Sequence, residues 1–164
     1  MTRPAKPKRR YPVEPLTPAE VARLLRQCST TAPTGIRNRA LITVMYRGGL
    51  RINEALALRA SDVNPDRGTI RGVPVDDGSM VLIHRWLEER AALPGELLFC
   101  TLDGAPLAAA YVRAMLHRIS REVDKRVTPE TLRRAWSAVD AYRAAIAPAD
   151  PVMMLREMTP PRVS

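Results

Sequence analysis

The spacing of apolar residues along the chain predicts a protein made mainly of helices. Residues 16–28 carry apolar side chains at helical intervals. Thr17 stands at the N-cap, Pro18 at the first helical position, and Glu20 where a capping box needs an acid. Residues 34–49 repeat this spacing and close on two glycines, which commonly end helices. Further helices are predicted over residues 52–59, 79–93, 107–123 and 127–145, the last with Thr128 as its N-cap.

Extended structure is predicted in two short places only. Residues 67–75 form one extended segment, whose length Gly72 and Pro74 limit. Residues 97–99 form a brief apolar strand before a turn around Gly104. The apolar stripes of the helices should face the core; they comprise Val21, Leu24, Leu25 and Cys28, then Ile36, Ala40, Leu41, Val44 and Met45, then Met80, Ile83 and Leu87, then Val112, Leu116, Ile119 and Val123. The predicted fold class is mainly α with a small β element.

Composition indicates an aliphatic core and excludes several classes of protein. Apolar residues make up 46% of the 164-residue chain and aromatic residues only 4%. No apolar run approaches the length of a membrane span, and no signal peptide is recognisable, so we expect a cytoplasmic protein without a membrane partner. Cys28 and Cys100 are expected to be buried thiols. His84 and His117 lack neighbours with ligand spacing, so we predict neither a metal site nor a cofactor.

Positive charge is concentrated at the beginning of the chain. Lysine and arginine total 26 against 17 acids, a net charge of +9. The first ten residues contain five cations and no acid; the cations are Arg3, Lys6, Lys8, Arg9 and Arg10. We therefore predict a basic arm over residues 1–15 and one domain over residues 16–164. Such an arm suits a polyanion such as nucleic acid, but a solubilising tail has the same composition.

Two arginine-containing stretches carry a resemblance to a known family. The segment "GLRINEALALRASDV" resembles the first arginine box of the tyrosine recombinase, or phage integrase, family, with Arg51 in its Gly-Leu-Arg step and Glu54 one turn later. The segment "TPETLRRAW" resembles the second box, with Arg133 at the arginine position. Flanking motifs follow the same order over residues 16–136. The resemblance implies the helical fold of that family's catalytic domain and double-stranded DNA as the partner.

The family's chemistry gives the two arginines an expected role. The reaction attacks a backbone phosphate, and guanidinium groups suit the negative charge that spreads over its oxygens. Arg51 and Arg133 are therefore expected to bind phosphate together. Alternatively, Arg51 pairs with a carboxylate and only supports the fold. The full set of candidate DNA-binding residues is Arg51, Arg133, Arg134, Arg71, Arg59, Lys6, Lys8, Arg9 and Arg10.

Two acids occupy positions where the family has histidines. Glu130 stands at the head of the second box, and Glu157 matches a later histidine. At neutral pH a carboxylate only accepts hydrogen bonds, and it repels a phosphate. Both residues are therefore expected to modify the arginine pocket. If Glu130 screens the arginines, Glu130→Gln should tighten DNA binding.

Two further catalytic groups of the family have no match in the sequence. The predicted hairpin lacks the family's lysine, because no lysine lies between Tyr11 and Asp124. The guanidinium of Arg71 is a poor substitute, since its pKa is too high for a proton donor. No tyrosine follows Tyr142, which comes only nine residues after Arg133. These departures predict that the chain is not an enzyme.

The favoured hypothesis is a catalytically inactive, recombinase-like DNA-binding protein that acts as a sequence-specific regulator. A phage or mobile-element repressor and an antagonist of a related integrase are the two forms considered. One alternative is a recombinase with a rearranged active site that uses Tyr142 or a nucleophile from another chain. Another is a decayed fragment that binds proteins, in which Glu130 and Glu157 neutralise Arg51 and Arg133 by salt bridges. A related integrase or a second copy of the chain is left open as a further partner.

Overall fold

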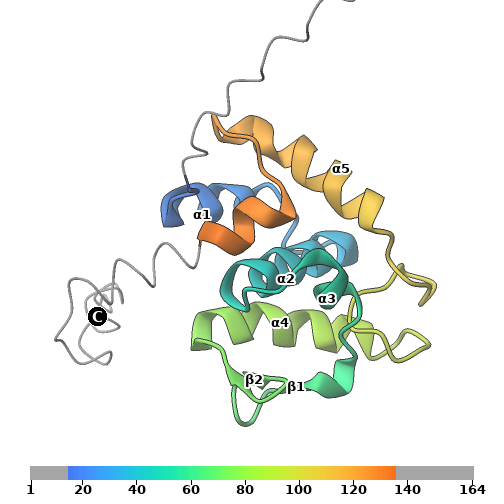
Figure 1. Ribbon diagram of the computed structural model, residues 1–164. Helices are drawn as coiled ribbons and strands as arrows, with labels where there is room; N and C mark the ends of the chain where they lie inside the picture. The colour runs from blue at the N-terminus through green and yellow to red at the C-terminus, as the bar shows by residue number, and fades with distance from the viewer. Residues whose placement is uncertain (1–14, 136–164) are drawn as a thin grey trace, which may run out of the picture.

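The computed structural model describes residues 15–135, and Figure 1 shows their arrangement. Its helices are α1 (Pro18–Arg26), α2 (Pro33–Arg47), α3 (Ile52–Leu56), α4 (Asp77–Arg90) and α5 (Ala109–Ile119), with 3-10 turns η1 (Ala60–Asp62) and η2 (Ser120–Glu122). Its strands are β1 (Val63–Asn64), β2 (Thr69–Ile70) and β3 (Val73–Pro74). A helical segment at 129–135 closes the described part. The predicted class, mainly α with a small β element, is confirmed. Within residues 15–135, no helix has the length and apolarity that a membrane crossing requires.

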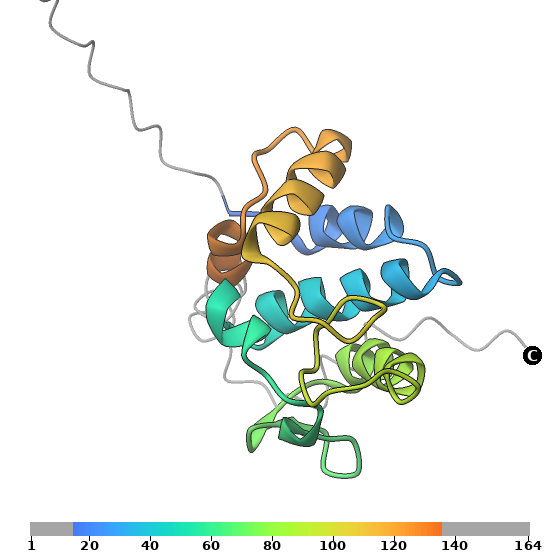
Figure 2. The ribbon, with the colours of Figure 1, turned by 90° about the vertical axis from the view of Figure 1, so that its right-hand side faces the viewer.

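Helix α2 forms the centre of the domain. It lies between α1 and α4, and α5 passes on the α1 side (Figures 1 and 2). The predicted apolar stripe of α2 is buried, but so are the polar residues Arg37 and Asn38. Arg37 donates to the carbonyl of Cys100 at 3.2 Å and to the hydroxyl of Tyr111 at 2.7 Å, and Asn38 donates to the same hydroxyl at 3.2 Å. Arg37 and Asn38 can therefore be buried because their polar groups are hydrogen-bonded internally.

The predicted helix starts and core stripes are largely confirmed. The hydroxyl of Thr17 accepts from the Glu20 N–H at 3.2 Å, and the Glu20 carboxylate accepts from the Thr17 N–H at 3.2 Å. The hydroxyl of Thr128 accepts from the Thr131 N–H at 3.2 Å. The stripes of α1, α4 and α5 face the core, except that Leu25 and Leu87 are only half-buried. The cap sequences therefore set the beginnings of these helices.

The small sheet is antiparallel, in the order β1-β2-β3. Ile70 pairs with Val63 on one side and with Val73 on the other. The turn between β2 and β3 consists of Arg71 and Gly72, both with positive φ, at 49° and 77°. Positive φ at both central residues is the geometry of a type I′ turn, which suits the right-handed twist of a two-strand hairpin. The extended segment predicted over residues 67–75 is therefore this hairpin.

Three predicted elements are shorter than expected or absent. The helix predicted over residues 107–123 is α5, which ends at Ile119 and is followed by η2. Residues 97–99 form no strand; Leu97 makes a single bridge to Arg59, and the Leu98 N–H donates to the Leu58 carbonyl at 2.8 Å. The buried indole N–H of Trp86 donates to the Leu98 carbonyl at 2.7 Å. A side chain thus supplies the donor that the backbone of a neighbouring strand would otherwise provide. Helix α3 ends at Leu56 rather than at residue 59, because the chain turns there to reach η1.

Candidate functional site

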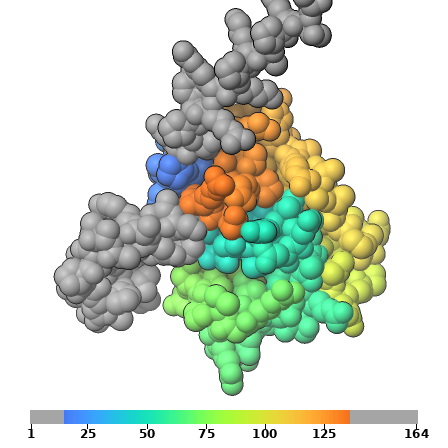
Figure 3. Space-filling model, in the orientation of Figure 1, coloured from blue at the N-terminus to red at the C-terminus, as the bar shows by residue number. Residues whose placement is uncertain are grey.

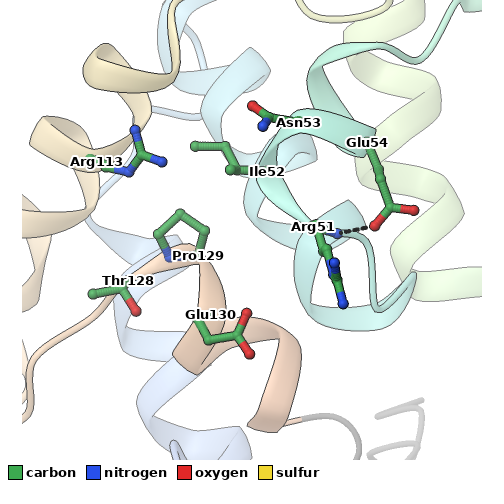
Figure 4. A pocket seen from close by; sticks show the side chains of 8 residues that line it. All are labelled: Arg51, Ile52, Asn53, Glu54, Arg113, Thr128, Pro129 and Glu130. Carbon is green, nitrogen blue, oxygen red and sulfur yellow. Dashed lines mark hydrogen bonds between the residues drawn. The ribbon is translucent and has the colours of Figure 1, made fainter.

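A pocket of about 740 Å³ opens where α3, α5 and the start of the segment 129–135 meet (Figure 4). On the face shown in Figure 3, the surface of segment 129–135 lies against that of the α3 region. The residues that line the pocket are Arg51, Ile52, Asn53, Glu54, Arg113, Thr128, Pro129 and Glu130. The fold thus brings two segments more than seventy positions apart in the sequence to one site.

Arg51 reaches the pocket through a sharp change of direction after α2. Gly48 caps α2 by donating to the Val44 carbonyl at 2.9 Å, and Gly49 follows with φ 62°. Arg51 is then the N-cap of α3, and its backbone N–H donates to the Glu54 carboxylate at 3.0 Å. Its side chain is exposed and makes no ion pair within residues 15–135. Glu54 therefore positions the backbone of Arg51 and leaves the guanidinium available to a ligand.

Glu130 binds two arginines of its own helical segment. Its carboxylate accepts from Arg133 twice, at 3.2 Å from Nε and 2.7 Å from Nη2, and from Arg134 Nε at 3.0 Å. The hydrogen bond from Arg133, helped by that from Arg134, outweighs desolvation and holds the pKa of the Glu130 carboxyl below its ordinary value. Glu130 is therefore ionised at neutral pH and occupies the fork of Arg133 in the manner of a bidentate carboxylate.

Arg113 is a pocket residue that the sequence analysis missed. It projects from α5, on the other side of Pro129 from the Glu130 carboxylate (Figure 4). Its side chain is exposed, and the described part of the chain offers it no hydrogen bond or ion pair. Nothing in the spacing of α5 distinguishes Arg113 from Arg118 on the same helix. Only the packing of α5 against α3 reveals it.

The remaining candidate cations do not line the pocket. Arg59 lies 3.2 Å from Glu96, and both side chains are largely exposed. Arg71 lies at the tip of the β2–β3 hairpin, 3.5 Å from Asp62. The candidates Lys6, Lys8, Arg9, Arg10 and Glu157, together with Tyr142, lie outside the described residues. The structure thus places Arg51 and Glu130 in one pocket, with Arg133 and Arg134 bound to Glu130 beside it.

Comparison with known proteins adds the family context. The model of the phage integrase family matches residues 14–139. The tyrosine recombinase XerC of Halalkalibacterium halodurans is 30% identical over 139 residues, which cover 72% of this chain and 46% of the relative. The crystal structure of XerA recombinase is similar with a TM-score of 0.70 at 21% identity, covering 92% of this chain and 56% of that one. The XerH site-specific recombinase bound to its difH substrate, a pre-cleavage complex, is similar with a TM-score of 0.63 at 25% identity, covering 79% and 43%. The chain spans about half the length of the curated relatives it matches.

These comparisons correct one expectation from the sequence. The prediction that the chain is not an enzyme is wrong, because the proteins it resembles are tyrosine recombinases, which are enzymes. That prediction depended on single positions, several of them within residues 136–164.

Proposed function

The chain belongs to the phage integrase family, and from this premise we propose that it is a recombinase-type domain that binds a backbone phosphate of double-stranded DNA. The observation that carries the proposal is the exposed guanidinium of Arg51 in the pocket shared by α3, α5 and segment 129–135. An arginine without an internal ion pair loses only water when a phosphate arrives, and it forms a charge-assisted hydrogen bond in return.

The basic residues outside the pocket extend this proposal. Lys6, Lys8, Arg9 and Arg10 belong to the proposed arm, residues 1–15, and add charge that attracts DNA in a salt-dependent way. Arg59 and Arg71 hold their exposed charges on loops around the small sheet. Relatives that bind or recombine DNA in bacteria support double-stranded DNA as the partner and the bacterial cytoplasm as the location.

The binding proposal is tested with Arg51→Ala. Loss of one charged hydrogen bond to a phosphate costs about 1.5–3 kcal/mol, which is about tenfold or more in Kd. Fluorescence anisotropy with a labelled DNA duplex at near-physiological salt measures this change. Arg26→Ala removes the same charge from the last turn of α1, outside the pocket, and should change Kd by less than about twofold. Equal effects of both variants would show that only overall charge matters.

Strand transfer is the activity that family membership suggests for such a site. A nucleophilic oxygen bonds to the phosphorus, a sugar hydroxyl leaves, and Arg51 stabilises the charge on the phosphate oxygens. We expect a covalent protein–DNA adduct on a nicked duplex that traps the intermediate. Mass spectrometry of the adduct identifies the nucleophile. The adduct should be lost in Tyr142→Phe and retained in Tyr11→Phe. DNA binding without any adduct would contradict the strand-transfer proposal and leave the binding proposal intact.

A regulatory use of the same DNA binding is the second candidate, and Glu130 favours it. Its carboxylate pairs with Arg133 and cannot donate a hydrogen bond. A phosphate bound at the pocket would therefore receive less stabilisation of its negative charge than a histidine at this position would provide. Selection of bound fragments from the sheared source genome tests this role. Enrichment beside promoters supports a repressor, and enrichment at attachment sites supports interference with an integrase. A profile without discrete sites contradicts regulation by sequence-specific binding.

A further inference from the structure

We infer that two guanidinium groups of this chain bind DNA phosphate, and that the second, beside Arg51, is Arg113 rather than Arg133. Arg133 is excluded because the Glu130 carboxylate already binds it. This inference rests on the proposed function, since it concerns the same pocket. It names a different pair of residues from the one that the two arginine boxes predict.

Arg133 is already bound by a carboxylate. Its fork makes two hydrogen bonds to Glu130, at 3.2 and 2.7 Å, and its side chain is 30% exposed. It is not among the residues that line the pocket. Two of its five N–H donors are thus bound to a carboxylate, and a phosphate would have to displace Glu130 to bind that edge of the fork. Such an exchange swaps one charged hydrogen-bond pair for another, so little binding free energy remains.

Arg113, in contrast, faces the pocket without a carboxylate partner in the described part of the chain. It lines the pocket from α5, whereas Arg51 lines it from the N-cap of α3 (Figure 4). Neither guanidinium has an ion pair within residues 15–135. DNA phosphates bound along this pocket would give each arginine a partner of opposite charge. Arg113 therefore gains from DNA what Arg133 already obtains from Glu130.

Glu130 lies between the pocket and the two arginines that it binds. Its carboxylate lines the pocket and also binds Arg133 and Arg134. The carboxylate therefore places negative charge near an incoming phosphate. It also occupies Arg133, which could otherwise bind that phosphate. Glutamine at this position would keep the size of the side chain and weaken its hold on both arginines. Arg133 would then be free to turn toward the phosphate, as a second, latent contact.

The test is equilibrium DNA binding by the full chain over a series of salt concentrations. Each phosphate contact contributes about 0.9 to the slope of log K against log salt. Arg113→Ala should weaken binding about tenfold and lower the slope by about this amount. Arg113→Lys should keep most of the slope, because the charge remains. Arg133→Ala should change Kd by less than about twofold and leave the slope unchanged. Arg113 is exposed, so its replacement leaves the core intact.

Glu130 variants supply the second readout. Glu130→Gln should tighten binding by about threefold to tenfold and raise the slope by up to about 0.9. This gain should vanish in the double variant Glu130→Gln/Arg133→Ala, because the released contact is gone. Glu122→Gln removes the same charge from an exposed position outside the pocket, and it should give less than about a twofold change.

The outcomes separate this inference from the proposed function. If Arg133→Ala weakens binding as much as Arg113→Ala, the inference is overturned. If Arg51→Ala weakens binding but Arg113→Ala does not, the inference fails while the pocket stays the DNA site. If neither variant matters, the proposed function fails as well. If Glu130→Gln tightens DNA binding equally in the double variant, the gain comes from reduced charge repulsion and not from the release of Arg133.

Discussion

Three glutamates show how single carboxylates organise this domain. Glu20 completes the cap of α1 and also binds Lys125 at 2.8 Å. Glu54 accepts from the backbone of Arg51 at 3.0 Å and thereby sets the start of α3. Glu130 binds arginine side chains instead of a backbone. The first two acids fix backbone geometry, whereas the third holds two guanidinium groups of its own helical segment.

The ion pair of Glu20 makes stability depend on pH. Burial raises the pKa of the Glu20 carboxyl, but hydrogen bonds from Lys125 and Thr17 outweigh it, so the pKa lies below the ordinary value. A depressed pKa in the folded state adds stability above the ordinary pKa of about 4.3, and this stability is lost as the pH falls through the folded-state pKa. Glu20→Gln should therefore lower the free energy of unfolding by about 1 kcal/mol at pH 7.

The measurement is urea denaturation of both proteins from pH 7 down through the glutamate range. The difference between them should shrink as the pH falls, because the native carboxyl becomes protonated too. Glu122→Gln serves as the control, since Glu122 is exposed and lacks an ion pair within the described chain. A difference that stays constant with pH would mean that Glu20 acts only as a neutral cap.

At the scale of elements, local sequence predicted beginnings better than ends. Thr17 and Thr128 cap their helices as expected, because a cap needs only residues within one turn. The prediction of a strand over residues 97–99 is wrong, since the Trp86 side chain donates to a backbone carbonyl that a strand partner would need. The end of α3 at Leu56 also depends on where the next segment must pack. Such competition between distant groups leaves no local pattern.

The candidate site follows the same division. Arg51 and Glu130 were identified because each belongs to a recognisable stretch of sequence. Arg113 was missed, because it contributes to the pocket only through the packing of α5 near α3. The bond between Glu130 and Arg133 was anticipated only within the alternative of a decayed fragment, in which salt bridges neutralise the arginines. Three-residue spacing on a helix permits such a pair but does not require it.

The hairpin between β2 and β3 carries a testable strain at Arg71. Its φ of 49° lies in the left-handed region, which costs an ordinary side chain about 1–2 kcal/mol and asparagine less. Arg71→Asn creates an Asn-Gly pair, the preferred sequence for a type I′ turn. The lost ion pair to Asp62, at 3.5 Å and half-exposed, offsets at most a few tenths of a kcal/mol.

We therefore expect Arg71→Asn to raise the free energy of unfolding by about 0.5 kcal/mol, measured by urea denaturation. Arg71→Ala loses the same ion pair without gaining a favoured turn residue, so it should be less stable than the asparagine variant. Equal stabilities of the two variants would show that the turn stores no strain at this position.

For the whole molecule, stability depends on the burial of α2 between α1 and α4. Leu41 and Met45 of α2 are fully buried in the single core cluster, as is Ile83 of α4. Leu41→Ala should lower the free energy of unfolding by about 2–5 kcal/mol, because a cavity remains in a core packed from both sides. Domains of this size have only about 5–15 kcal/mol in total.

Val81→Ala on α4 is the matched comparison, since Val81 is 66% exposed. It should change stability by less than about 0.5 kcal/mol. Chemical denaturation of the two variants tests the central position of α2. A small effect of Leu41→Ala would contradict it, because the layers around α2 would then be able to close the cavity.

The contact of Lys125 with the start of the domain has a consequence for how DNA is captured. Its ammonium group donates to the Pro15 carbonyl at 3.2 Å and to Glu20 at 2.8 Å, just before the segment that carries Glu130. The point at which residues 1–14 leave the domain is thus anchored near one wall of the pocket. Fourteen residues span at most about 50 Å. If DNA binds at Arg51 as proposed, the cations of residues 1–14 would add a second, tethered contact at high effective concentration, which makes the binding bivalent.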